Sequence, residues 1–143
     1  MTKYLTLDSN IFIASIKGDE EYSDASTKII SRIGSDLLLV EPSIIFTEVG
    51  NAVTRNLDVD VAREELQSLR RAITVIQTCD VEFCYRAGLT GGQYNIYSCD
   101  SLYLQTSIDH QTILVSLDED EFVNRIKAKT KVIEVFHVRE FLY

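Results

Sequence analysis

Two aspartates stand where predicted β-strands end. Asp8 follows a short β-type run at residues 3–7, and Asp118 follows a run at residues 113–115. Ligands of open parallel sheets bind beyond the carboxyl ends of the strands, so we expect both side chains at one edge of the sheet. Their carboxylates are the hard oxygen donors that Mg²⁺ and Mn²⁺ prefer.

Two more acids lie on the apolar faces of predicted helices. Glu48 follows Ile44 by four residues and Asp100 precedes Leu104 by four, so each acid shares the inward stripe of its helix. Burying an unpaired carboxylate costs several kcal/mol, so such residues are normally paired, protonated or bound to metal. The four acids together therefore favour a site for one or two divalent cations.

Such a site would support hydrolysis of a phosphodiester bond. Mg²⁺ or Mn²⁺ can activate a water molecule and stabilise the leaving oxygen, so the lack of a well-placed histidine base is no obstacle. Taken singly, each acid has a simpler interpretation as a solvated, turn or cap residue. Neutral side chains that could orient the carboxylates or water have a similar alternative as turn residues; they are Ser9, Asn10, Asn51 and Ser116.

The composition is that of an ordinary globular domain. The chain has 143 residues, 45% of them hydrophobic and 25% charged, which predicts a single domain over residues 1–143. Its 14 basic and 22 acidic residues give a net charge of −8. That balance argues against broad electrostatic binding of nucleic acid, but not against an enzyme that acts on nucleic acid through bound cations.

The sequence favours a cytoplasmic location and no membrane contact. No apolar run is long enough to span a bilayer, and the apolar run at the start is too short for a signal peptide. The three cysteines show no C-x-x-C pairing, so we interpret them as reduced thiols, small residues of the core.

Short apolar runs alternate with helical patterns along the whole chain. Strands are predicted at residues 3–7, 37–40, 73–76, 113–115 and 132–135. Helices are predicted between them, with Ser43, Asp60, Asp80 and Ser98 as N-caps. This alternation predicts an α/β fold with a doubly wound parallel sheet of about five strands, covered on both faces by helices.

Four segments, in order, resemble the motifs of the PIN-domain family. Residues 7–12 resemble the first motif and residues 42–53 the second, where a Glu is followed three residues later by Asn. Residues 97–103 and 114–122 resemble the third and fourth. In the fourth, Ser replaces the usual Thr and the aromatic residue lies one position late. The fourth acid can therefore be Asp118 or Asp120, and we prefer Asp118.

The resemblance implies a PIN-like nuclease domain that cleaves RNA with Mg²⁺ or Mn²⁺. It also implies kinship to VapC toxins, and hence an RNA substrate, an antitoxin protein as partner, and a homodimer. The apolar surplus at residues 11–16 gives weak support to a dimer, although core packing is the preferred interpretation. The alternative function is a catalytically silent PIN-like module that binds RNA or protein.

Other α/β enzymes with an aspartate after the first strand fit less well. A phosphoaspartate phosphatase needs a second aspartate where this chain has Asn10, and a receiver domain needs an acidic neighbour that Asp8 lacks. No phosphate-loop motif occurs. Basic residues on the helix that includes Arg63 and near the chain's end could contact RNA phosphates, and Tyr94 or Tyr97 could stack on a base. Solvated faces and buried aromatics are the commoner interpretations of such residues.

Overall fold

The protein is an α/β sandwich around one parallel sheet. The computed structural model describes residues 2–141, and within them five strands form a sheet in the order β3-β2-β1-β4-β5. The strands are β1 (Lys3–Leu7), β2 (Leu37–Pro42), β3 (Ile73–Gln77), β4 (Ile113–Ser116) and β5 (Val135–His137). The predicted doubly wound parallel sheet of about five strands is confirmed.

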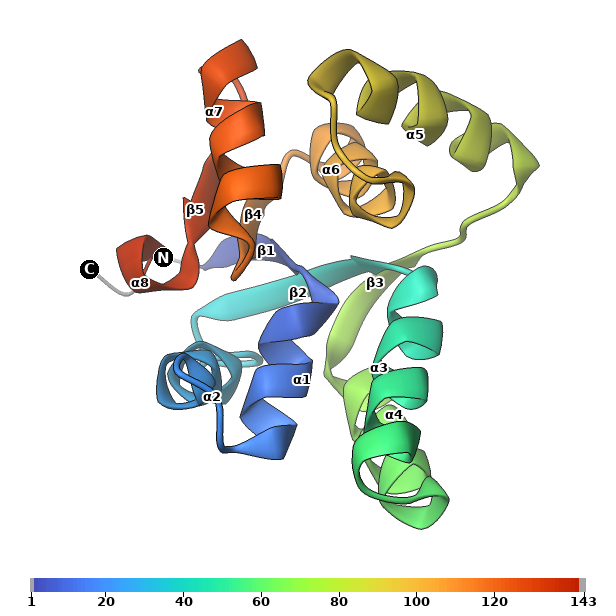
Figure 1. Ribbon diagram of the computed structural model, residues 1–143, viewed down its shortest axis with the longest axis vertical. Coiled ribbons are helices and arrows are strands. Elements are labelled where there is room, and N and C mark those ends of the chain that lie inside the picture. Colours follow the sequence, from blue (N-terminus) through green and yellow to red (C-terminus); the bar gives the residue numbers. More distant parts are fainter. Residues whose placement is uncertain (1, 142–143) are drawn as a thin grey trace.

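Helices cover both faces of the sheet (Figure 1). One face carries four consecutive helices that pack on one another: α1 (Ser9–Lys17), α2 (Ser23–Ser31), α3 (Ile44–Asn56) and α4 (Val59–Ala72). The opposite face carries α5 (Val81–Tyr94) and α6 (Ser98–His110), packed against each other. The π-helical turn η1 (Glu119–Val123), α7 (Asn124–Lys129) and α8 (Val138–Phe141) flank β4 and β5.

The order of the strands sets the position of the site. The chain runs from β1 outward to β2 and β3, then returns to place β4 on the other side of β1. The order of the strands reverses at β1, and open α/β sheets bind their ligands at the carboxyl ends of the strands beside such a reversal. Asp8 follows β1 directly, and Asp118 follows β4 by two residues.

The core lies between the sheet and its helices. The side chains of Leu5, Leu7 and Leu114 are fully buried, as expected for central strands with both faces covered. Ile11 and Phe12 of α1 belong to the same apolar cluster. Ile13 and Ile16 are partly buried against this cluster, so the apolar stretch at residues 11–16 contributes mainly to the core, as the preferred interpretation predicts.

Several local predictions need correction. Asp80 caps α5 by accepting from the Phe83 N–H at 2.9 Å, as predicted, but Asp58, not Asp60, caps α4. Tyr97, not Ser98, precedes α6. Ser43 precedes α3, but its hydroxyl does not cap the helix. The hydroxyl instead accepts a hydrogen bond from the Cys79 N–H. For Ser43, a backbone partner 36 residues away in the chain takes the place of the local cap.

The last strand and the cysteines also differ from expectation. The predicted strand at residues 132–135 forms only at Val135–His137, and Val132 is 91% exposed. Cys84 and Cys99 are exposed and Cys79 is half-buried, so the prediction of core cysteines was wrong. Among residues 2–141, no helix is both long and apolar enough to cross a membrane.

Candidate metal centre

Asp8 lies at the carboxyl end of β1, beside the end of β4. Its backbone N–H donates to the Val115 carbonyl at 2.9 Å, which continues the β1–β4 ladder to the first residue after β1. The side chain is only 5% exposed, and its Oδ2 atom accepts a hydrogen bond from the Ser116 hydroxyl at 2.7 Å. Strand pairing and Ser116 therefore fix both the backbone and the carboxylate of Asp8.

Asn10 and Ser116 connect the β1 end to the loop that follows β4. The Asn10 side-chain amide donates to Ser116 Oγ at 3.3 Å, and its carbonyl accepts from the Leu117 N–H at 3.3 Å. Ser116 Oγ also accepts from the Asp118 N–H at 3.0 Å. Two of the four neutral side chains singled out in the sequence thus hold the backbone that carries Asp118.

Glu48 is held by a residue that the sequence analysis did not single out. The Tyr103 hydroxyl donates to Glu48 Oε1 at 2.6 Å, and the Tyr103 side chain is fully buried. Tyr103 belongs to α6 and Glu48 to α3, so the bond joins helices from opposite faces of the sheet. The available signal was the spacing of Tyr103 three residues after Asp100, which places both on one helical face.

Burial and the charges of nearby acids raise the pKa values of Asp8 and Asp100. Burial raises the pKa of Asp8 to about 7, and the charge of Asp100 makes the next largest contribution. The hydrogen bond from Ser116 lowers that pKa, while Glu48 and Asp118 raise it. Burial, then Asp118 and Glu48, raise the pKa of Asp100 to about 6. The four carboxylates therefore form one cluster of mutually repelling charges at the carboxyl edge of the sheet.

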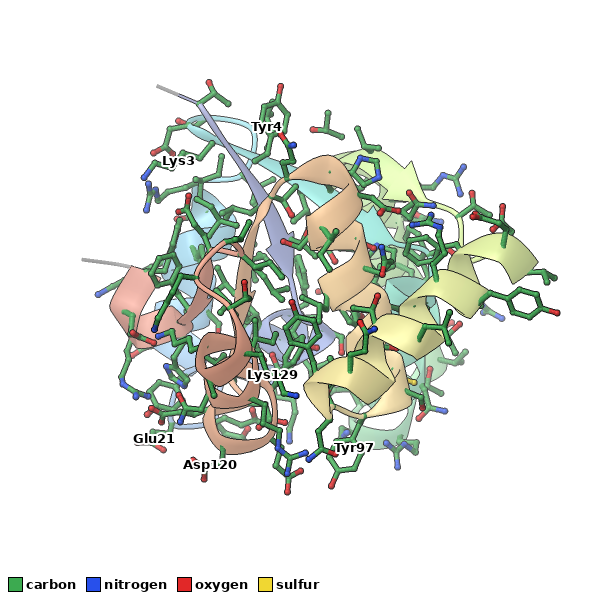
Figure 2. All side chains as sticks on the ribbon, turned by 90° about the horizontal axis from the view of Figure 1, so that it is seen from above. Lys3, Tyr4, Glu21, Tyr97, Asp120 and Lys129 are labelled. Carbon is green, nitrogen blue, oxygen red and sulfur yellow. The ribbon has the colours of Figure 1, made fainter. Side chains whose placement is uncertain are left out.

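The acids that follow β4 differ in their distance from this cluster. Asp118 is half-buried and contributes to the raised pKa values of both Asp8 and Asp100, whereas Asp120 is exposed and contributes to neither. Figure 2 shows Asp120 at the periphery of the molecule. Glu121, which the sequence analysis did not single out, also raises the pKa of Asp100. The geometry favours Asp118 over Asp120.

Tyr97 stands beside these acids at the surface. Its side chain is 59% exposed, projects outward in Figure 2, and has its pKa raised by a hydrogen bond with Glu121. Tyr94, by contrast, packs against the core. Only Tyr97 of this pair is therefore free to stack on a base.

An open pocket of about 320 Å³ adjoins Glu48. Ser9, Asn51 and Arg55 line it together with Glu48, whereas Asp8, Asp100 and Asp118 do not. Asn51 is exposed, and across residues 2–141 no hydrogen bond joins its side chain to an acid of the cluster. Arg55 follows Glu48 by seven residues on the same helical face, a spacing that could have indicated it.

Sequence comparison decides the family. A family model described as PIN domain matches residues 5–128. The chain belongs to the PIN-domain family. No curated protein matches it in sequence.

Solved structures share this PIN-domain fold at low sequence identity. VapBC2 from Rickettsia felis, bound to a DNA fragment from its promoter, is 14% identical with a TM-score of 0.67, covering 94% of this chain and 98% of that one. Mycobacterium tuberculosis VapC20, described as a toxin that cleaves the sarcin-ricin loop, is 8% identical with a TM-score of 0.69, covering 91% and 98%. VapBC-1 from nontypeable Haemophilus influenzae is 15% identical with a TM-score of 0.67, covering 95% and 98%.

PIN-domain nucleases generally use divalent metal ions, and the donors in this chain fit such an ion in their chemistry. The cluster offers only carboxylate oxygens, and burial and repulsion raise the pKa of two of the acids. Within residues 2–141, however, no three His, Cys, Asp or Glu side chains lie close enough to bind one ion together. Electrostatic coupling acts over longer distances than direct ligation. Mg²⁺ commonly keeps several waters and takes one or two carboxylates, so the separation is compatible with a hydrated ion.

Proposed function

We propose that this PIN domain is a Mg²⁺- or Mn²⁺-dependent endoribonuclease. The observation that carries the proposal is the concentration of four acids at one edge of the sheet, where the pKa of Asp8 is raised to about 7. Acids that only keep a protein soluble need not lie where their charges repel one another. A cation bound among these acids would relieve that repulsion. The residues proposed to hold one or two hydrated cations, directly or through bound water, are Asp8, Glu48, Asp100 and Asp118.

The chain's own residues prepare the site for hydrolysis. A bound divalent cation supplies positive charge against the phosphodiester and lowers the pKa of a water molecule. Ser116 orients Asp8, and Tyr103 orients Glu48, through the hydrogen bonds described above. Asn10 and Ser116 fix the backbone of Asp118. Attack by water rather than by the ribose 2′-hydroxyl leaves a 5′-phosphate and a 3′-hydroxyl.

A groove beside the acids supports RNA as the substrate. The pocket at Glu48 adjoins a second pocket of about 450 Å³ between α3 and α4, and the two share Thr47, Asn51 and Arg55 as lining residues. Arg63 lines the second pocket. Guanidinium groups bind phosphate oxygens in bidentate fashion, so Arg55 and Arg63 would track an RNA backbone that leads to the acids.

We further propose that the protein is the toxin of a toxin–antitoxin pair. Its structural neighbours include the VapBC complexes of Rickettsia felis and Haemophilus influenzae, which supports an antitoxin protein as partner. We propose a single domain over residues 1–143 that acts in the cytoplasm as a homodimer. A strictly monomeric mass in solution at micromolar concentration would contradict the homodimer.

Cleavage of a structured RNA by the purified protein tests the proposed activity. We expect EDTA to abolish cleavage, added Mn²⁺ or Mg²⁺ to restore it, and the products to carry 5′-phosphates. Asp100→Asn should abolish cleavage, while Asp120→Asn, which changes an exposed acid outside the cluster, should not. Products that end in 2′,3′-cyclic phosphate would contradict the mechanism. Binding without cleavage under all metal conditions would favour the silent RNA-binding module instead.

A further inference from the structure

Strands β1 and β2 separate before they reach the acid cluster. Their parallel pairing ends at Leu5 and Leu39, whereas β1 stays paired with β4 as far as Leu7 and Val115. The end of β1, which carries Asp8 as the next residue, is therefore supported by backbone pairing on one side only. Something else must satisfy the polar backbone groups on the β2 side, because buried N–H groups without a partner are costly.

Two side chains bridge this gap between the strands. The Thr6 hydroxyl donates to the Val40 carbonyl at 2.8 Å, and Glu41 Oε1 accepts from the Leu7 N–H at 2.5 Å. The second contact lies one residue before Asp8. Glu41 belongs to β2, 34 residues away from Leu7 in the chain.

Glutamate is an unusual residue at a fully buried position of a sheet. The Glu41 side chain is fully buried, and within residues 2–141 its Oε2 atom has no hydrogen-bond partner. Burial holds the pKa of Glu41 well above its usual value, and the charge of Asp8 raises it further. A sheet position that needed only volume would be filled at lower cost by an apolar side chain. The carboxyl oxygen that meets the Leu7 N–H is the feature that an apolar side chain cannot supply.

We propose that Glu41 is a positioning residue for Asp8. By accepting the Leu7 N–H where the β1–β2 pairing has ended, it holds the end of β1 so that the Asp8 carboxylate faces the other three acids. It acts through the backbone of β1 and not by touching the cation or the RNA. The inference rests on the proposed function, because it assumes that Asp8 helps to hold a divalent cation.

Two substitutions distinguish the role of the acceptor oxygen of Glu41 from that of the volume of its side chain. Glu41→Gln keeps an oxygen that can accept the Leu7 N–H, whereas Glu41→Leu keeps a similar volume without any acceptor. The matched control is Ser107→Ala, which removes another buried hydrogen bond, from the Ser107 hydroxyl to the Thr112 carbonyl at 2.6 Å, outside the cluster. The measurements are Mn²⁺ affinity by calorimetry on the full chain, and hydrogen exchange of the Leu7 and Asp8 amides in EDTA.

We expect Glu41→Leu to weaken Mn²⁺ binding by about 10- to 100-fold, the range found when groups that orient metal ligands are removed. The Leu7 and Asp8 amides of this variant should exchange faster. Glu41→Gln should bind Mn²⁺ like the parent, and Ser107→Ala should lower thermal stability without changing Mn²⁺ affinity. If Glu41→Leu does not fold, Glu41→Met, with its more adaptable side chain, gives the same comparison.

Unchanged Mn²⁺ affinity and unchanged exchange in a folded Glu41→Leu would overturn the inference. A Glu41→Gln variant as weak as Glu41→Leu would overturn it too, because the acceptor would then not be the deciding group. A parent protein that binds no Mn²⁺ would overturn the proposed function together with this inference. A parent that binds Mn²⁺ while all the variants bind it equally would overturn the inference alone.

Discussion

At the scale of single residues, Tyr103 shows how a buried hydroxyl can serve a charged site. It donates to Glu48 Oε1 at 2.6 Å while its ring lies fully buried in the core. Burial together with the charges of Asp8 and Glu48 raises the pKa of Tyr103 well above its usual value, so the hydroxyl keeps its proton and remains a donor. Its orientation of Glu48 is thus independent of pH over the neutral range.

Tyr103→Phe isolates this hydroxyl because the ring and its packing remain. We expect RNA cleavage and Mn²⁺ affinity to fall about 10-fold or more, since Glu48 loses the group that orients it. The free energy of unfolding should fall by only about 1 kcal/mol, the usual value of one hydrogen bond. Cleavage rates, calorimetry and urea unfolding measure the three effects. Tyr85→Phe, which changes a tyrosine that is 72% exposed, is the control; an equal loss of activity in both variants would contradict the role.

At the scale of elements, α3 combines the acid site with the proposed path of the RNA. Glu48 and Arg55 lie seven residues apart on it and line one pocket, so the same helical face carries a carboxylate of the cluster and a cation. Helix α4 adds Arg63 across the adjoining pocket. A chain with a net charge of −8 can bind RNA in this way only if its few cations are placed locally.

Arg55→Gln tests this placement. We expect weaker RNA binding and a salt dependence whose slope falls by about 1, as for the loss of one phosphate contact. The control Arg70→Gln removes an exposed cation of α4 that lines neither pocket. Binding is measured with a labelled RNA over a series of salt concentrations in EDTA, which prevents cleavage. Equal slopes for the parent and Arg55→Gln would show that the RNA runs elsewhere.

At the scale of the whole molecule, the acid cluster opposes folding when no cation is bound. The pKa of Asp8 rises from an ordinary value of 3.8 to about 7, so the folded state binds a proton more tightly than the unfolded state does. The stabilising contribution of Asp8 to the free energy of unfolding is therefore fully present below pH 4 and is lost as the pH rises through 7. Three pKa units correspond to roughly 4 kcal/mol, so this contribution is a sizeable part of the stability of a small domain.

The metal-free protein should therefore be more stable near pH 5 than near pH 8. Asp8→Asn should flatten this slope, because the amide does not titrate, and should leave the protein at pH 8 as stable as the parent or more so. Mn²⁺ at 100 times its dissociation constant should stabilise the parent at pH 8 by about 2.7 kcal/mol and Asp8→Asn much less. Thermal unfolding in EDTA and in Mn²⁺ measures both effects, with the exposed Asp19→Asn as control. Identical pH slopes in all three proteins would contradict the cluster.

Four of the five strands, most of the helices and the proposed four acids could be predicted from the sequence alone. Apolar periodicity, turn residues and the position of an acid after a strand are properties of neighbouring residues, so they can be interpreted without the fold. The N-caps show the limit of such local patterns. Asp80 caps its helix as predicted because its partner is three residues away, whereas Ser43 is drawn to the Cys79 N–H, 36 residues along the chain.

The residues that orient those acids could be identified only from the fold. Tyr103 and Glu48 are 55 residues apart in sequence, and Glu41 meets the Leu7 N–H across a gap between strands that no local pattern reveals. The raised pKa of Asp8 likewise depends on burial and on charges from three other segments. Such properties arise where distant segments meet, because distance and desolvation, not residue type alone, set the strength of a hydrogen bond or a charge interaction.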